Sequence, residues 1–275
     1  MKLLILIIAF VCNLSTIAEA DEIENIVKKI SQLTSQSCTP DTLVDKNRPI
    51  QVAFLRGSLI DAFNAPQAGE DYLQVTKDVL QSQGYNVRTL SAHHTGWQKI
   101  CDSFKVSPNS RVVLVGHSYG SSGAMKVANC LAENKIKTEL LINVSSFDFL
   151  AGVDVATIPE HVQNHINFWV TDPLIPGYKN HTAMNPEVTN LENIEAKVVA
   201  LSPHIQAVGK LLPVLGLVTS AQMFGSSSSI SMGSVISNRQ VTDNLDTVWD
   251  CEQPQSLTQN DAEADNDNSS DSDED

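Results

Sequence analysis

The chain has 275 residues, of which 42% are hydrophobic and 18% are charged, and its formal net charge is −14. This composition excludes a chain that is disordered throughout and a membrane-embedded helical bundle. Nine of the 32 acidic residues lie in residues 252–275, which contain no Lys or Arg, so the rest carries 23 acids against 18 bases. A protein needs a basic surface to bind a nucleic acid, which is a polyanion, so we expect no nucleic-acid partner.

The first twenty residues have the pattern of a removable export signal. Lys2 supplies a positive start, residues 3–11 form an unbroken apolar run, and residues 18–20 have the small-x-small pattern of a cleavage site. The apolar run is too short to span a bilayer as a helix. We therefore expect residues 1–20 to be removed and the mature protein to be secreted.

An oxidising compartment outside the cytoplasm permits disulfide bonds. Four cysteines remain after the signal is removed: Cys38, Cys101, Cys130 and Cys251. An even number favours two disulfides, but four cysteines allow three pairings and the sequence does not choose among them. The alternative for Cys130 is a buried free thiol.

Strand-like and helix-like segments alternate along the mature chain. An amphipathic helix is expected near residues 23–33, after which compact apolar runs predict strands and helical spacing of apolar residues predicts helices. In chain order the pattern predicts a strand at 51–55, a helix at 69–83, a strand at 86–90, a helix at 97–104, a strand at 112–115, a helix at 121–133 and strands at 139–144, 164–170 and 196–201. This order predicts an α/β fold, a mostly parallel sheet flanked by helices.

The pattern becomes less regular beyond residue 210. Residues 211–224 are apolar but interrupted by Pro213 and Gly216, and the end of the chain is acidic and rich in Ser and Asn. The acidic, Ser- and Asn-rich composition of the end of the chain cannot bury a core. We expect a core domain over 21–210, a C-terminal appendage or lid over 211–251 and a disordered acidic tail over 252–275.

The segment 116–120 reads Gly-His-Ser-Tyr-Gly and lies between an expected buried strand and an expected helix. G-x-S-x-G in this context is the pattern of a nucleophile elbow. The turn is so tight that side chains in place of Gly116 and Gly120 would collide with neighbouring backbone. The alternative interpretation is a Gly/Ser turn without chemistry.

An elbow predicts the role of two residues. Ser118 would be a nucleophile, held in a strained conformation with its hydroxyl at the carboxyl edge of the sheet. The backbone amide of Tyr119, at the positive end of the helix that follows, would donate a hydrogen bond to an oxyanion.

With this motif the sequence resembles the α/β-hydrolase superfamily, in its exported lipase-like or thioesterase-like branch, over roughly residues 50–210. The resemblance lies in Val-Val-Leu-Val-Gly-His-Ser-Tyr-Gly at 112–120 and in Ile158-Pro-Glu-His-Val162 with Ile166-Asn-Phe-Trp169. It implies an α/β-hydrolase fold and a catalytic triad in the order nucleophile, acid and histidine, each partner in a loop after a strand.

The base is sought among seven histidines. His204 follows the expected strand 196–201 in a loop at its carboxyl end, where the resemblance places the base, and His181 is the second candidate. The other five are His93, His94, His117, His161 and His165, of which the first two could line the site and the last two are expected at the surface.

The acid has two candidates. Asp148 follows the expected strand 139–144 by a few residues and is preferred, although relatives often have Asp-Pro at this strand end, where the chain has Ser145–Ser146. Asp172 ends the next expected strand, the commoner place for the acid across the superfamily, and its alternative role is a turn-forming Asp-Pro.

A second oxyanion donor is expected in the loop 56–59, as a backbone amide near Ser58. No Cys/His spacing fits zinc and no phosphate-binding glycine loop is present, so we expect neither a metal nor a cofactor.

These patterns predict an exported serine hydrolase that cleaves carboxylic ester, lipid or thioester bonds. Ser118 would attack the carbonyl, His204 would take its proton and Asp148 would orient the histidine. The expected partner is a small-molecule or lipid ester, with transient contact with a membrane or lipid surface. The alternatives are a catalytically inactive binding protein with a hydrolase fold, and a serine peptidase.

Overall fold

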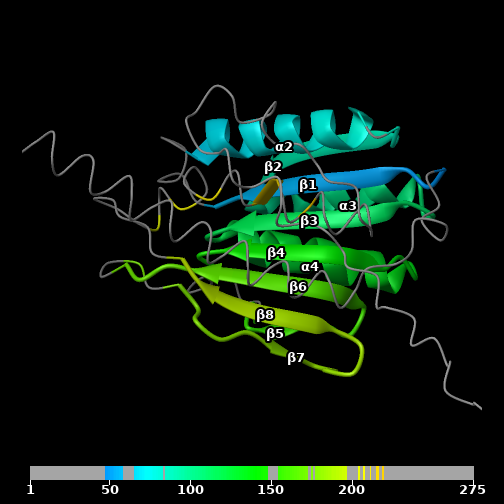
Figure 1. Ribbon diagram of the computed structural model, residues 1–275. Coiled ribbons are helices and arrows are strands. Elements are labelled where there is room, and N and C mark those ends of the chain that lie inside the picture. The colour runs from blue at the N-terminus through cyan, green and yellow to red at the C-terminus, as the bar shows by residue number, and fades with distance from the viewer. Residues whose placement is uncertain are drawn as a thin grey trace, which may run out of the picture.

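The computed structural model describes residues 47–57, 65–82, 84–147, 154–172, 175 and 177–196, and further along the chain residues 204, 207, 211, 215, 216 and 219. These residues are built around one six-stranded sheet in the strand order β2-β1-β3-β4-β6-β8 (Figure 1). Every neighbouring pair of strands in the sheet is parallel. The prediction of a parallel α/β sheet is confirmed.

The strands of the main sheet are β1 (Ile50–Arg56), β2 (Val87–His93), β3 (Arg111–His117), β4 (Thr138–Val144), β6 (Val162–Trp169) and β8 (Asn190–Glu195). The helices are α2 (Ala65–Ser82), α3 (Trp97–Lys105) and α4 (Gly120–Glu133), with the short 3-10 helix η3 (His94–Gly96). A separate two-stranded sheet pairs β5 (Thr157–Ile158) with β7 (Thr182–Ala183).

Both faces of the sheet are covered, and alternate residues of a strand serve different faces. In β1, Ile50, Val52 and Phe54 join one buried cluster, whereas Ala53 and Leu55 join the other. The first cluster contains side chains of α2, and the second those of α3 and α4. A strand buried on both faces reads as a continuous apolar run, which explains why β1 and β3 were predictable from sequence.

Part of the C-terminal stretch packs on the α2 side of the sheet. Leu211 and Leu215 are buried members of the same cluster as α2. The hydroxyl of Tyr72 in α2 lies 2.8 Å from that of Thr219, and both residues are fully buried. These described residues of the expected appendage therefore contribute to the main core.

The last strand lies earlier than the sequence predicted. The strand that pairs with β6 is β8, Asn190–Glu195, and not residues 196–201. β8 is an edge strand with the sequence Asn-Leu-Glu-Asn-Ile-Glu, and most of it is partly exposed. It therefore lacks the compact apolar run that predicts a buried strand. Apart from Ala196, the expected range lies outside the described residues.

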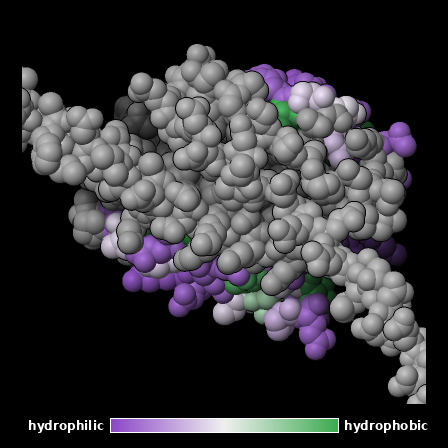
Figure 2. Space-filling view, in the orientation of Figure 1, coloured by the Kyte–Doolittle hydropathy of each residue, from purple (hydrophilic) through white to green (hydrophobic). Residues whose placement is uncertain are grey.

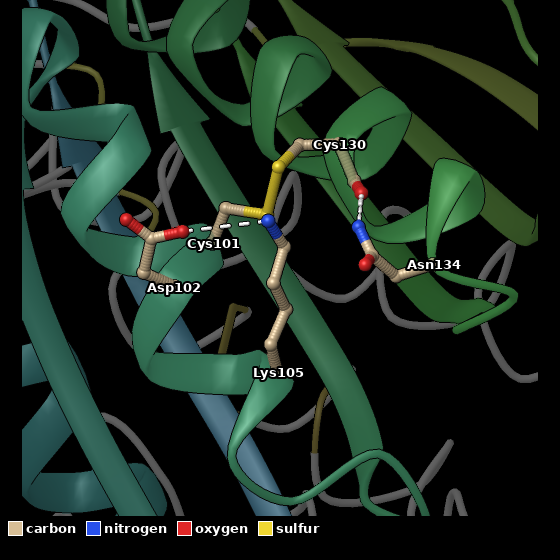
Figure 3. The surroundings of a disulfide bond; sticks show 5 residues. All are labelled: Cys101, Asp102, Lys105, Cys130 and Asn134. Carbon is tan, nitrogen blue, oxygen red and sulfur yellow. Dashed lines mark hydrogen bonds and ion pairs between the residues drawn. A yellow bond between two sulfur atoms is a disulfide. The ribbon is translucent and has the colours of Figure 1, made fainter.

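A disulfide bond joins Cys101 in α3 to Cys130 in α4 (Figure 3). The alternative of a free thiol at Cys130 is wrong. At the end of α4, the side chain of Asn134 donates a 2.8 Å hydrogen bond to the carbonyl of Cys130. Cys38 and Cys251, the other two cysteines predicted to pair, lie outside the described residues.

Other predictions fall on segments that the structure does not describe. Residues 1–20, the helix expected near 23–33 and the acidic tail 252–275 all lie outside the described residues. Within the described part of the chain, no helix is long and apolar enough to cross a membrane. Where Figure 2 shows described residues, hydrophilic and hydrophobic surface lie interspersed.

Candidate active site

The carboxyl end of β3 leads directly into the elbow. β3 is buried over its whole length, and Ser118, the next residue, has a φ of 57°, which a non-glycine residue adopts only at a cost. A Cβ at Gly116 would lie 2.5 Å from the Cα of Ser121, and a Cβ at Gly120 would lie 1.9 Å from the carbonyl oxygen of Leu55. Both positions therefore require glycine, as the motif predicted.

His204 is next to the nucleophile candidate. Its Nε2 lies 2.8 Å from the Oγ of Ser118, and both side chains are almost completely buried. The main chain of His204 is held by His117, whose Nε2 donates a 2.9 Å hydrogen bond to the His204 carbonyl. The structure thus brings together the serine and the histidine that the sequence singled out, from positions 86 residues apart.

The other ring nitrogen of His204 faces a hydroxyl group. Its Nδ1 lies 2.6 Å from the Oγ of Ser145, which is completely buried and directly follows β4. The sequence predicted the partner of the histidine three residues later, at Asp148, and Ser145 stood out only as a departure from the resemblance. No sequence signal marks Ser145 for this contact, because the pairing of β4 with β3 that brings it to His204 is known only from the sheet.

The two aspartate candidates differ in what the structure says of them. Asp148, the preferred acid, lies outside the described residues. Asp172 is buried near His204, and its Oδ2 accepts a 3.0 Å hydrogen bond from the backbone N–H of His204. Its Oδ1 accepts another from the backbone N–H of Ile175, at 3.1 Å.

The surroundings keep His204 neutral. Burial, and next the nearby His117, lower the pKa of His204 to about 3, while the carboxylate of Asp172 acts in the opposite direction. An imidazole with this pKa is unprotonated at neutral pH, which is the form that can accept a proton from Ser118.

The predicted oxyanion donors are placed in part. Tyr119 directly precedes α4, so its backbone N–H lies at the positive end of that helix, beside Ser118. Ser58 lies outside the described residues, but its neighbour Gly57 is described, and the Gly57 carbonyl lies 3.1 Å from the Nδ1 of His94. The close approach of Gly120 to the backbone of Leu55 and Arg56 brings the carboxyl end of β1 next to the elbow.

Aromatic rings border the Ser118–His204 pair. The rings of Tyr119 and Phe147 meet edge to face at 5.2 Å between centroids, and Phe147 also lies edge-on to His204 at 6.4 Å. The ring of His94 also lies near Tyr119, with 5.8 Å between the ring centroids. His94 thus lies close to the site, as the sequence allowed.

A second hydrogen-bonded chain begins at the neighbouring residue, Ser146. Its Oγ lies 2.8 Å from the Nε2 of His181, whose Nδ1 lies 2.8 Å from the Nε2 of His165. The Nδ1 of His165 in turn lies 3.0 Å from the carbonyl oxygen of Leu141. His181, the second candidate for the base, is therefore paired with Ser146 and not with Ser118.

The carbonyl of Leu141 sets the direction of every proton in this chain. A carbonyl only accepts, so Nδ1 of His165 carries a hydrogen and, in the neutral ring, its Nε2 accepts one from His181. The Nε2 of His181 then accepts the hydroxyl hydrogen of Ser146. The expectation that His165 lies at the surface is wrong, since it is 1% exposed in β6, between β4 and β8.

Within the described residues, no group of three or more His, Cys, Asp or Glu side chains is arranged to hold a metal ion.

No protein-family model matches the sequence, and no curated protein matches it significantly. Among solved structures, a cutinase-like protein from Cryptococcus sp. matches with 10% identity and a TM-score of 0.40, over 66% of this chain and 97% of that one. An esterase domain from a Rhodothermus marinus protein matches with 16% identity and a TM-score of 0.39, over 64% and 88%. An α/β serine hydrolase without a lid from Xanthomonas campestris matches with 12% identity and a TM-score of 0.37, over 66% and 84%. At these identities the similarity concerns the fold alone.

Proposed function

We propose that the protein is a secreted serine hydrolase that cleaves carboxylic ester bonds, with Ser118 as the nucleophile and His204 as the general base. The observation that carries this proposal is the 2.8 Å approach of His204 Nε2 to Ser118 Oγ. This contact lies at a serine with positive φ, between a buried strand and the start of a helix. A Gly/Ser turn without chemistry would need neither the strain nor the histidine.

The reaction follows the two steps of acyl transfer. The Oγ of Ser118 attacks the ester carbonyl carbon while its proton passes to Nε2 of His204, and the carbonyl π electrons move onto the oxygen. The backbone N–H of Tyr119, with one from the loop that contains Ser58, stabilises the oxyanion. The C–O bond to the alcohol then breaks as His204 gives its proton to the leaving oxygen. In the second step His204 takes a proton from a water whose oxygen attacks the acyl carbon, and it returns this proton to the Oγ of Ser118 as the acid leaves.

The rings around the nucleophile favour an ester with an apolar acyl or alkyl group. Tyr119 and Phe147 present aromatic surface beside Ser118 and His204. Contact of this surface with an apolar substrate group removes both from water, which favours binding. Small-molecule esters, lipids and thioesters share this chemistry at the carbonyl. Contact with a lipid surface would bring the lipid substrates to the site.

The disulfide supports action outside the cytoplasm. A bond such as Cys101–Cys130 forms and persists in oxidising compartments and is rare where glutathione keeps thiols reduced. This agrees with the removable signal predicted at residues 1–20, and we infer that the mature enzyme is secreted.

A fluorophosphonate probe tests the assignment, because it reacts only with an activated serine. We expect the full chain to be labelled and to hydrolyse p-nitrophenyl butyrate, and Ser118→Ala to do neither. Ser110→Ala is the matched control, since Ser110 is equally buried but lies before β3, at the opposite end of that strand. It should retain both properties.

The same experiment decides between the alternatives. Labelling that survives in Ser118→Ala would remove Ser118 as the nucleophile. A native chain that is folded but neither labelled nor active on esters and thioesters would favour an inactive binding protein. Cleavage of peptide amides in preference to esters would favour a serine peptidase.

A further inference from the structure

The unusual feature of the site is the group that contacts Nδ1 of His204, the ring nitrogen that does not face Ser118. For Nε2 of a neutral imidazole to take the proton of Ser118, the ring hydrogen must be on Nδ1. The atom that faces Nδ1, at 2.6 Å, is the hydroxyl oxygen of Ser145. In this tautomer the Ser145 oxygen is the acceptor for the Nδ1 hydrogen, the task that a carboxylate performs in a Ser-His-Asp triad.

The Ser145 hydroxyl is held in place for this contact. The backbone N–H of Ser145 donates a 2.6 Å hydrogen bond to the carbonyl of Phe168 in β6, and its φ is 48°. A Cβ at Gly177 would lie 3.2 Å from the Ser145 Oγ, so the backbone at Gly177 packs closely against the hydroxyl. An acceptor that is fixed before the reaction needs no reorganisation when the imidazole becomes charged.

Asp172, the buried carboxylate near His204, forms its hydrogen bonds with backbone groups. Both oxygens of Asp172 accept backbone N–H groups, from His204 and from Ile175. Asp172 therefore fixes the main chain of His204, and its carboxylate acts to raise the pKa of the ring.

We propose that Ser145 is the positioning residue of the base: its hydroxyl holds the Nδ1–H tautomer of His204, in the place that a carboxylate takes in the common triad. This inference rests on the proposed function. In the acylation step the O–H bond of Ser118 breaks, an N–H bond forms at Nε2, and the Nδ1 hydrogen stays on His204 and remains bonded to Ser145.

A neutral partner changes the pH range in which the base works. A hydroxyl stabilises an imidazolium less than a carboxylate does, so the ring stays unprotonated to lower pH. Burial and His117 lower the pKa of His204 to about 3, against the opposing effect of Asp172. Activity should therefore persist well below pH 6, where a triad with an ordinary histidine pKa loses its base.

Replacing the acceptor tests the proposal. Ser145→Ala removes it, and we expect kcat with p-nitrophenyl butyrate to fall about 10- to 100-fold at unchanged KM. Ser145→Asp supplies a carboxylate at a φ that aspartate tolerates. It should restore kcat and move the acid limb of kcat/KM up by about one pH unit or more, because an adjacent carboxylate raises the pKa of an imidazole.

The neighbouring serine provides the matched control. Ser146 is equally buried, but its hydroxyl is bonded to His181. Ser146→Ala loses an equivalent hydroxyl without touching His204, so its pH profile should follow that of the native chain. An Ser145→Ala variant with native kcat and native pH profile would overturn the proposal, as would an Ser145→Asp variant whose acid limb does not move.

The tautomer of His204 gives a readout that does not depend on hydrolysis. In Ser118→Ala, the ¹⁵N chemical shifts of the ring at pH 7 should show hydrogen on Nδ1, and Ser145→Ala in the same background should lose this preference. A ring protonated on Nε2 with Ser145 intact would overturn the role of Ser145 even in an active enzyme. An inactive protein that shows Nδ1–H would retain the Ser145 contact and reject only the proposed hydrolase activity.

Discussion

At the scale of single residues, the site combines backbone strain with buried polar contacts. Ser118 and Ser145, the two serines that contact His204, both have positive φ values, 57° and 48°. Left-handed backbone costs a non-glycine residue about 1–2 kcal/mol. Both directly follow the carboxyl ends of adjacent parallel strands. At these positions the strained backbone places each hydroxyl against His204.

The strain at Ser118 can be measured by comparing two substitutions. Ser118→Gly and Ser118→Ala both remove the hydroxyl, but only glycine adopts a φ near 57° without a steric penalty. We expect the free energy of unfolding in urea to be about 1 kcal/mol higher for Ser118→Gly than for Ser118→Ala. Equal stabilities would mean that the elbow stores no strain at this residue.

The two aspartate candidates for the acid can be tested by the effect of their substitution on kcat. If Ser145 holds Nδ1, neither Asp148→Asn nor Asp172→Asn should cost the ~10⁴-fold in kcat that a triad carboxylate supplies. Asp172→Asn should have a modest effect, since Asn keeps one acceptor for the backbone N–H of His204. A ~10⁴-fold loss in Asp148→Asn would restore the acid predicted from sequence.

At the scale of elements, the helices on one face of the sheet are joined covalently. The Cys101–Cys130 bond closes a loop of 29 residues between α3 and α4. Cys130 lies near the end of α4, ten residues or about 15 Å along the helix from its start at Gly120. The bond should therefore affect stability without touching the chemistry.

The double substitution Cys101→Ser with Cys130→Ser tests this separation. Chain entropy predicts a loss of about 3–4 kcal/mol in the free energy of unfolding for a loop of this length. We expect the urea midpoint to fall while kcat/KM at 25 °C is retained. A large loss of activity in the folded variant would show that the position of α4 depends on the bond.

The buried histidine pair makes the stability of β6 and its neighbours depend on pH. Burial lowers the pKa of His181 to about 4 and that of His165 well below its usual value. Between pH 6.5 and about 4 the unfolded chain binds protons at these rings that the folded protein does not. Stability is thus full above pH 6.5 and falls as the pH is lowered, by up to about 1.4 kcal/mol per pH unit for each histidine.

Replacing His165 by glutamine isolates this effect. The Gln amide can donate to the Leu141 carbonyl and accept from His181, but it does not titrate in this range. Urea unfolding between pH 7 and 4.5 should show a shallower decline for His165→Gln than for the native chain. Parallel curves would mean that His165 is protonated equally in the folded and unfolded states.

At the scale of the whole molecule, charge and core are distributed unevenly along the chain. Residues 254–275 carry eight acids and no Lys or Arg, and they offer few apolar side chains. By contrast Leu211 and Leu215 are buried in the cluster that contains α2. The two parts of the C-terminal region should therefore respond differently to truncation.

Removal of residues 254–275 changes the formal net charge from −14 to −6. We expect a higher isoelectric point with the same melting temperature and the same activity on soluble esters. Removal of 211–275 should leave an insoluble protein, because burying each Leu is worth about 1.5–3 kcal/mol. A soluble product that loses activity only on lipid aggregates would identify 211–251 as a lid.

What the sequence determined by itself is the local part of this protein. The buried strands β1 and β3, the glycines of the elbow and the nucleophile candidate at Ser118 follow from short-range patterns, since a strand, a tight turn and a helix start are each read within a few residues. His204 was preferred over His181 because it follows an expected strand, although the strand before it in the structure is β8 and not residues 196–201. The edge strand β8 and the burial of His165 were misplaced, because their surroundings are set by pairing with distant strands.

The tertiary structure alone decided which group faces Nδ1 of His204. Ser145 and His204 are 59 residues apart, and they meet only because β3, β4, β6 and β8 are adjacent in one parallel sheet whose carboxyl ends share an edge. A serine has no sequence signature that separates an acceptor for an imidazole from an ordinary turn residue. Ser146, the neighbour of Ser145, contacts a different histidine, His181, so adjacent serines have different partners that only the folded chain brings to them.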